Sequence, residues 1–315
     1  MSVSAPNNAA TYKSTSDGPP LRDRLAKLVP IFVLAPSIAA SFLYVFVFTG
    51  WTFYISLSNS TLLPTYGFEG FENYASLWAN RRWGIAYTNL FVFSAFYVVC
   101  AMAIGLMLAL LIDQKIRAES FWRTIFLYPL AVSFIVTGTV WSWLYNPTNG
   151  FEFLIRNLGW TDFRFALTTD RKYAIYAIVI TGIWQSSGFA MALFLAGLRS
   201  VDGDIIKAAQ IDGASTFRTY RKVILPSITP IFLAVAVVLL QFSIKTFDLA
   251  VALTNSGPGI STTFPATYVY DLMFQRGQIG EGAAASMMIL SALAVVLIPY
   301  SFYLVWQRRR EAGHG

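Results

Sequence analysis

Six long segments without a charged residue dominate the 315-residue sequence. Each exceeds the roughly 20 helical residues that cross about 30 Å of hydrocarbon, and a helix satisfies its own backbone hydrogen bonds in lipid. Charged residues make up 12% of the chain, against about 25% in a typical soluble domain. The sequence therefore predicts an all-α membrane protein with six transmembrane helices, at about residues 28–57, 83–112, 124–147, 173–198, 223–246 and 282–306.

The segments outside these runs are short and polar. Residues 1–27 are rich in Ser, Asn and Pro, which predicts a disordered tail, and residues 308–315 form a second tail after the 28–307 membrane domain. The first apolar run is too long for a cleavable signal peptide. One further apolar patch, 264–274, is about half a span long and predicts an interfacial or re-entrant helix that begins at Pro265.

Lys and Arg are distributed unevenly between the loops. The two tails and the loops 113–123 and 199–222 hold 15 of the 23 basic residues, and the loops on the opposite side hold 8. Because basic residues concentrate in cytoplasmic loops, both termini are predicted to be cytoplasmic. This topology accounts for the net charge of +7, so no nucleic-acid partner is expected.

The residues that usually carry catalysis are scarce. Cys100 and His314 are the only cysteine and histidine, and no G-x-x-x-x-G-K-[ST] phosphate-binding motif occurs. We therefore expect no catalytic residue, no metal site and no cofactor, and any energy from ATP must come from a partner.

The loop 199–222 carries the most specific local pattern. Asp204 can cap a helix that runs to Ile211. Gly213 can supply the positive φ that ends this helix, and Ser215 can cap a second short helix. Helices this short are marginal alone in water, so the pair is expected to dock either on the rest of the chain or in a groove of a partner. The apolar side chains available for docking are Ile205, Ile206, Ala209 and Phe217.

The same loop resembles the "EAA" cytoplasmic loop of ABC importer permeases. The resemblance is carried by Lys207 to Phe217 (KAAQIDGASTF) followed by Leu225-Pro226. It extends to Phe71-Glu-Asn-Tyr74, to Phe121-Trp-Arg123 with Pro129, to Trp141 through Pro147, and to Phe247-Asp248 leading to Gly257-Pro258. From about residue 30 to the C-terminus, the chain is similar to binding-protein-dependent permeases of the maltose and glycerol-3-phosphate type. It departs from them at Lys207, where Glu is usual, and at Asn255 and Ser256, where glycines are usual.

The resemblance implies the type I ABC importer permease fold in a bacterial-type plasma (inner) membrane. It implies a second permease subunit in a heterodimer, two cytoplasmic ATPase subunits and an external or periplasmic solute-binding protein. It also assigns ATPase coupling to Lys207, Ala208, Ala209, Asp212, Gly213, Ala214 and Phe217. The implied function is ATP-driven import of a mono- or small oligosaccharide, with glycerol-3-phosphate or another small polar solute as the alternative. A secondary transporter is a further rival, although such proteins commonly place charged residues inside their spans.

Polar and aromatic residues in or beside the spans are candidates for the substrate pathway. They are Trp184, Gln185, Ser187, Gln241, Lys245 and Asp248. Hydrogen bonding between helices is the alternative role for Gln and Ser. Lys245 and Asp248 are three residues apart and are expected to pair on one helical face. Gly182, Gly188 and Gly197 are expected to permit close helix packing.

Overall fold

The computed structural model describes residues 33–63, 65–114 and 116–312 and divides into two units, Met1–Trp51 and Thr52–Gly315. Within the described residues the secondary structure is helical, apart from one isolated bridge between Ser58 and Phe68. The all-α prediction is therefore confirmed. The predicted tail 1–27 lies outside the described residues, as do residues 313–315 of the C-terminal tail.

The first unit is described from Val33 onward. The charge-free helix Val33–Ser56, which includes the π-helical turn η1 (Leu43–Val47) and α2 (Phe48–Ser56), begins in this unit and ends after the unit boundary at Trp51. A helix that is apolar on all sides over this length suits a lipid environment.

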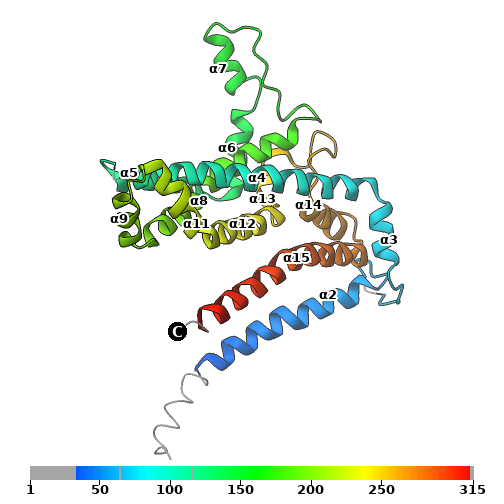
Figure 1. Ribbon diagram of the computed structural model, residues 1–315. Helices are drawn as coiled ribbons and strands as arrows, with labels where there is room; N and C mark the ends of the chain where they lie inside the picture. Colours follow the sequence, from blue (N-terminus) through cyan, green and yellow to red (C-terminus); the bar gives the residue numbers. More distant parts are fainter. Residues whose placement is uncertain (1–32, 64, 115, 313–315) are drawn as a thin grey trace, which may run out of the picture. The chain divides into compact units, whose positions relative to one another are not determined.

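The second unit contains the remaining helices (Figure 1). They are α3 (Glu72–Ala79), α4 (Arg81–Asp113), α5 (Glu119–Ala131), α6 (Phe134–Leu144), α7 (Phe151–Asn157), α8 (Ala174–Ser200), α9 (Gly203–Ile211), α10 (Thr216–Thr219), η2 (Tyr220–Ile224), α11 (Leu225–Ser227), α12 (Thr229–Ile244), α13 (Asp248–Thr254), α14 (Pro265–Tyr270), η3 (Asp271–Gln275) and α15 (Ile279–Ala312). The long helices α4, α8 and α15 cover three of the predicted spans, and α14 begins at Pro265 as the sequence predicts.

Two of the predicted spans are broken. The α5–α6 pair bends by 95°, and the helix from Thr216 to Ser227 meets α12 at 64°. The predicted spans 124–147 and 223–246 therefore each consist of bent helical segments and not of one continuous helix. Prolines contribute to both breaks: Pro129 lies in the last turn of α5, and Pro230 in the first turn of α12. The described chain has four helices long and apolar enough to span a membrane, or six if each bent pair is one span.

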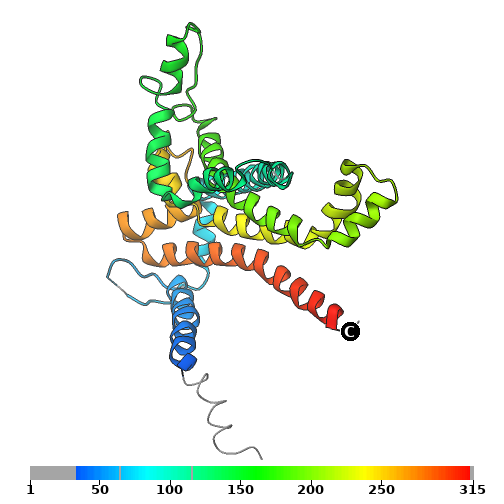
Figure 2. The same ribbon diagram turned by 90° about the vertical axis from the view of Figure 1, so that its left-hand side faces the viewer.

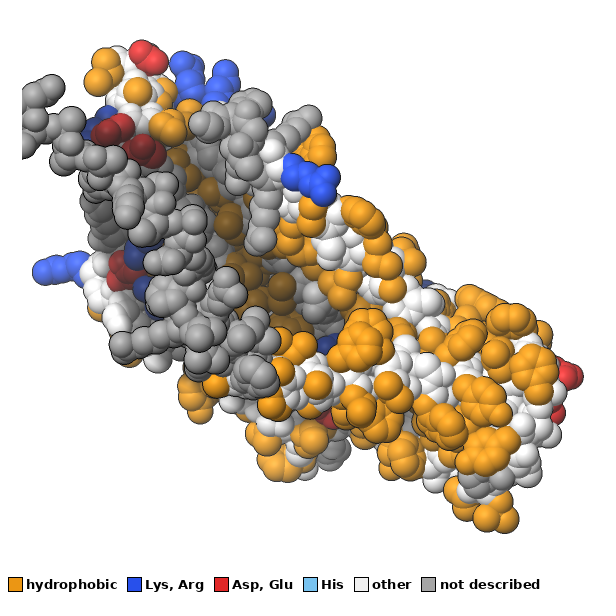
Figure 3. Space-filling view, turned by 90° about the horizontal axis from the view of Figure 1, so that it is seen from below, with side chains coloured by type: hydrophobic (Ala, Val, Ile, Leu, Met, Phe, Trp, Pro, Cys, Tyr) orange, Lys and Arg blue, Asp and Glu red, His pale blue; other side chains and the backbone are white. Residues whose placement is uncertain are grey.

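The core of the second unit lies where α4 and α8 pack together. Phe93 and Tyr97 of α4 and Phe194 of α8 are buried there. The helices approach closely because Gly105 faces Ala190, where an added Cβ would lie 2.5 Å from the Ala190 Cβ. Helix α6 pairs with α13, while α12 packs on both α4 and α8. In the space-filling view, hydrophobic side chains cover much of the described surface (Figure 3), as expected for a surface that faces lipid.

Candidate functional site

Two short helices after α8 form the first candidate site. Figure 2 shows α9 and α10 in yellow-green at one end of the second unit, away from α6 and α7. Asp202, and not Asp204, caps α9, because its side chain accepts a hydrogen bond from the Asp204 backbone N–H at 2.9 Å. The chain is still extended at Asp202 and turns helical at Gly203. Asp204 instead lies in the first turn, where it accepts a hydrogen bond from Lys207 Nζ at 2.9 Å.

The turn between the two helices has the predicted form. Gly213 has φ +76°, a conformation that costs an L-residue about 1–2 kcal/mol. The backbone N–H of Ala214 donates to the Ala209 carbonyl at 3.0 Å, which closes a Schellman-type end to α9. Ser215 caps α10 by accepting a hydrogen bond from the Arg218 backbone N–H. The predicted stop at Gly213 and cap at Ser215 are confirmed.

The loop presents apolar side chains to solvent. Ile205, Ile211 and Phe217 are 51%, 86% and 74% exposed. Ile206 instead packs against the core of the second unit. Of the predicted coupling residues, Lys207, Ala208, Asp212, Gly213 and Phe217 are exposed, while Ala209 and Ala214 are half-buried. The helix pair thus touches its own bundle on one side and leaves an apolar face that no described residue covers.

A cluster of charged and polar side chains joins the two ends of this loop to the bundle. We call Asp113, Glu119, Arg199 and Tyr220 the base cluster. Tyr220 Oη donates to Asp113 Oδ2 at 2.6 Å, and Arg199 Nε lies 3.8 Å from Asp113 Oδ1. Arg199 Nη2 also pairs with Glu119 Oε1 at 2.9 Å.

The pKa values of Glu119 and Tyr220, which lie outside the predicted spans 124–147 and 223–246, depart from their ordinary values. The hydrogen bond from Arg199 lowers the pKa of Glu119. Burial, followed by the neighbouring Asp113 carboxylate, raises the pKa of Tyr220 to about 12. Glu119 is therefore ionised and Tyr220 is a neutral hydrogen-bond donor at neutral pH.

A cavity of about 220 Å³ between α4, α6, α8, α12 and α13 forms the second candidate site. Its lining is Phe93, Tyr97, Phe134, Gly182, Phe242, Lys245, Thr246, Phe247, Asp248 and Leu249. Half of the lining residues are aromatic, and Lys245, Thr246 and Asp248 lie where α12 ends and α13 begins. The cavity therefore adjoins the break between α5 and α6, because Phe134 is the first residue of α6, and it also adjoins the turn between α12 and α13.

Lys245 and Asp248 are the predicted pathway residues that line this cavity. Their expected position on one helical face is wrong, because α12 ends at Ile244 and α13 begins at Asp248. Among the ion pairs of the described residues, none joins these two side chains. The chain turns at Thr246 and Phe247, so the helical spacing assumed for the pair does not apply.

The other four predicted pathway residues lie outside the cavity lining. Gln185 is buried, and its Nε2 donates to the Val132 carbonyl at 2.8 Å, in the break between α5 and α6. Trp184 packs edge-on against Trp141 with ring centroids 5.6 Å apart. Ser187 is buried and Gln241 is half-buried. Gln185 thus donates a hydrogen bond to the Val132 carbonyl, which the break in the helix would otherwise leave unpaired.

Sequence reasoning missed the aromatic wall of the cavity. Phe93, Tyr97, Phe134, Phe242 and Phe247 lie among 51 aromatic residues that the sequence alone does not rank. The one available signal is Phe247-Asp248, which already belongs to the segments that carry the resemblance.

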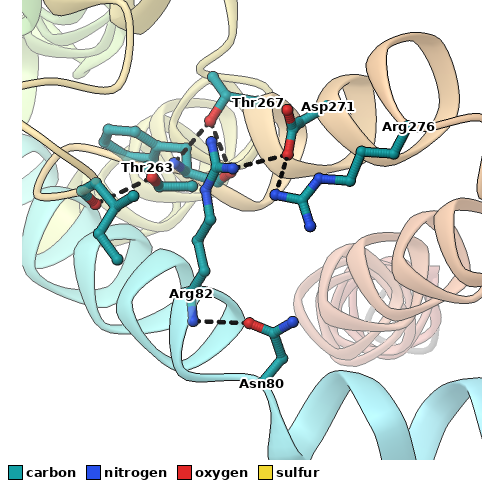
Figure 4. Close-up of polar contacts among 8 residues, drawn as sticks. Asn80, Arg82, Thr263, Thr267, Asp271 and Arg276 are labelled. Atoms are coloured by element: carbon teal, nitrogen blue, oxygen red, sulfur yellow. Dashed lines mark hydrogen bonds and ion pairs between the residues drawn. The ribbon is translucent and has the colours of Figure 1, made fainter.

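A third polar group lies around the start of α4. Arg82 and Arg276 both point to Asp271, each at 2.7 Å from its Oδ2 (Figure 4). Both guanidinium groups also lie over the Tyr268 ring, at 5.4 and 5.8 Å from its centroid. Asn80 caps α4 by accepting a hydrogen bond from the Arg82 backbone N–H. This group joins α4 to η3 and supports the local fold.

A family model and individual relatives of this chain both describe membrane components of transport systems. Residues 101–311 match the family described as "Binding-protein-dependent transport system inner membrane component". A probable ABC transporter permease protein of Pyrococcus horikoshii is 37% identical over 283 residues, which cover 89% of this chain and 96% of that protein. The xylose/arabinose import permease protein XacH of Haloferax volcanii is 33% identical and covers 81% of each chain.

A solved structure shares the fold. It is a bacterial ABC transporter involved in the import of the acidic polysaccharide alginate, and it superposes with a TM-score of 0.74 over 92% of this chain and 98% of its own. At 19% sequence identity, this likeness supports the architecture alone.

Proposed function

This chain belongs to the binding-protein-dependent transport system inner membrane components, and we propose that the solute it carries is a sugar. The family match over residues 101–311 carries the functional conclusion. The chain is a permease subunit of an ABC transporter in the inner membrane and not an enzyme, and ATP hydrolysis belongs to a separate subunit. It works with an ATPase and with a solute-binding protein, and we infer that a second, related permease subunit completes the pathway.

We propose that the membrane domain has six spans with both termini in the cytoplasm, each bent pair counting as one span. The division of basic residues between the loops supports this orientation. Single cysteines at Thr161 and Ser215, both exposed, test it in a Cys100→Ala background. An impermeant thiol reagent added outside sealed cells should label position 161 and spare position 215. Labelling of position 215 would refute the orientation.

We propose that α9 and α10 dock in a cleft of the ATPase. The exposed Ile205, Ile211 and Phe217 supply an apolar contact surface, and the small Ala208 and Ala209 allow close approach. The assigned coupling residues Lys207, Ala208, Ala209, Asp212, Gly213, Ala214 and Phe217 all lie in this loop.

Phe217→Glu tests the docking. The variant should insert normally and lose copurifying ATPase, because a charge would enter the apolar contact. Phe153→Glu is the matched control, since Phe153 is 50% exposed in α7, in a loop proposed to lie on the opposite side of the membrane. Normal retention of ATPase by Phe217→Glu would exclude docking through this face.

The chemistry of the 220 Å³ cavity favours a neutral polyhydroxylated solute. Its aromatic rings offer apolar faces to a sugar ring, and Thr246, Lys245 and Asp248 offer donors and acceptors. One cationic and one anionic side chain balance each other, which disfavours a doubly charged phosphate ester. The volume is below the range of about 300–1,000 Å³ usual for ligand sites, consistent with a second subunit supplying further wall.

Competition for uptake tests the sugar assignment. The complete transporter in liposomes should take up at least one of radiolabelled glucose, xylose, arabinose or maltose, and glycerol-3-phosphate should not compete. Asp248→Asn should make glycerol-3-phosphate a better competitor because the cavity gains net positive charge. Strong competition by glycerol-3-phosphate in the unmodified transporter would favour the alternative substrate. Uptake by this chain alone, driven by a proton or sodium gradient, would contradict the ATP-driven function.

A further inference from the structure

The base cluster brings both ends of the 199–222 loop to one carboxylate. Arg199 lies at the end of α8, where the loop begins, and Tyr220 lies where the loop returns to the bundle. Both contact Asp113, the last residue of α4, one on each carboxylate oxygen. Through Arg199 the cluster also includes Glu119, the first residue of α5.

Outside the base cluster, the loop is held by Val201 and Ile206, which pack against the core, and by a hydrogen bond from Gln114 Nε2 to Tyr220 Oη at 3.3 Å. Helix α9 has no buried residue. A cavity of about 350 Å³ lies beneath it, with Ile206 and Gln210 of α9 on one side and Asp113, Arg199 and Leu198 on the other. Because α9 spans this space instead of packing broadly on the helix ends, its position depends on how its two ends are fixed.

The ion pairs of the base cluster are only partly open to solvent. The side chains of Asp113, Glu119 and Arg199 are 19%, 29% and 41% exposed. Arg123 adds a second cation at 3.8 Å from Glu119, so two acidic and two basic side chains balance. Salt screens such pairs less than fully exposed ones, and the short Tyr220 bond to a carboxylate is charge-assisted.

We propose that Asp113 is the positioning residue for energy coupling, because it fixes both ends of the loop to α4. A displacement of α9 by the ATPase then moves α4, α5 and α8 together instead of swinging the loop about its ends. This inference rests on the proposed docking of α9 and α10 on the ATPase. Asp113 contacts neither ATP nor solute in this role and acts through Arg199 and Tyr220.

Two variants each remove one of the two interactions of Asp113, the ion pair with Arg199 or the hydrogen bond from Tyr220. Asp113→Asn keeps an acceptor for Tyr220 and loses the charge that attracts Arg199, while Tyr220→Phe loses the hydroxyl and keeps the ion pair. In the assembled transporter in liposomes, ATP hydrolysis and uptake of radiolabelled glucose, xylose, arabinose and maltose are measured together. We expect normal copurification of ATPase, sustained hydrolysis and a fall of about fivefold or more in solute moved per ATP. Asp113→Glu should restore most of the ratio.

Asp271→Asn is the matched control, because Asp271 is also a carboxylate shared by two partners, Arg82 and Arg276. It should lower thermal stability and leave the solute-to-ATP ratio unchanged. An unchanged ratio in Asp113→Asn would overturn the proposal, as would an equal fall in Asp271→Asn. Loss of ATPase from Asp113→Asn would also overturn it, because Asp113 would then build the docking surface. Failure of the docking itself is read separately, from ATPase retention by Phe217→Glu.

Discussion

Gly188 offers a severe test of how α5 and α8 pack. A Cβ at this position would lie 2.6 Å from the carbonyl carbon of Phe126 and closer still to its oxygen. Both are backbone atoms of α5, so no side chain can turn aside to make room. In Gly188→Ala, the two helices must therefore separate until this contact approaches the usual carbon separation of about 3.5 Å.

The separation has a second cost at the break in α5–α6. Gln185 lies one turn before Gly188 on α8, and its bond to Val132 crosses the same interface. Overpacking costs about 1–3 kcal/mol, and loss of this hydrogen bond adds about 0.5–1.5 kcal/mol. We expect Gly188→Ala to lose about 2–4 kcal/mol in total, which lowers the unfolding midpoint by roughly 5–10 °C.

Gly84→Ala is the matched control for this prediction. Gly84 also lies inside a long helix, α4, but a Cβ there meets nothing within 4 Å. Because Ala favours a helix over Gly by about 0.5–1 kcal/mol, this variant should be unchanged or slightly more stable. The measurement is thermal unfolding of the detergent-purified transporter, followed by size-exclusion chromatography after heating. Equal midpoints for the two variants would refute the close approach of α5 to α8.

Three further predictions concern other contacts of this chain. Gln185→Leu should lower the free energy of unfolding by about 1–3 kcal/mol, because the Val132 carbonyl loses its donor, while uptake per folded transporter should stay normal. A loss of uptake at normal stability would indicate that Gln185 contacts the solute. Ser256 has φ +68°, so Ser256→Gly should be tolerated or stabilising by up to about 1 kcal/mol, while Ser256→Val should destabilise by about 1–2 kcal/mol in the same unfolding assay. Glu152→Gln should loosen the segment 146–173, because buried Glu152 pairs with Arg156 at 2.6 Å. Faster protease cleavage within this segment is the measurement, and unchanged cleavage would contradict this role.

Features that depend on neighbouring residues could be predicted from the amino-acid sequence. Long charge-free runs located α4, α8 and α15, because partition into hydrocarbon depends on the side chains of each segment. The C-terminal end of α9 and the start of α10 followed from Gly213 and Ser215, because capping and positive φ act within a few residues. Asn255 and Ser256, where the family usually has glycines, both have positive φ in the structure, a conformation that glycine adopts readily.

The breaks in the helices and the contacts around them could not be predicted from the sequence, because they depend on how the helices pack. The break between α5 and α6 is held by Gln185, 53 residues from Val132 in the chain, and no local pattern encodes that pairing. Lys245 and Asp248 looked like neighbours on one helix, yet the chain turns between them and both line a cavity. The bond from Tyr220 to Asp113 spans 107 residues. Such contacts form only when separate helices pack, so their partners depend on the whole bundle and not on the spacing of residues in any one segment.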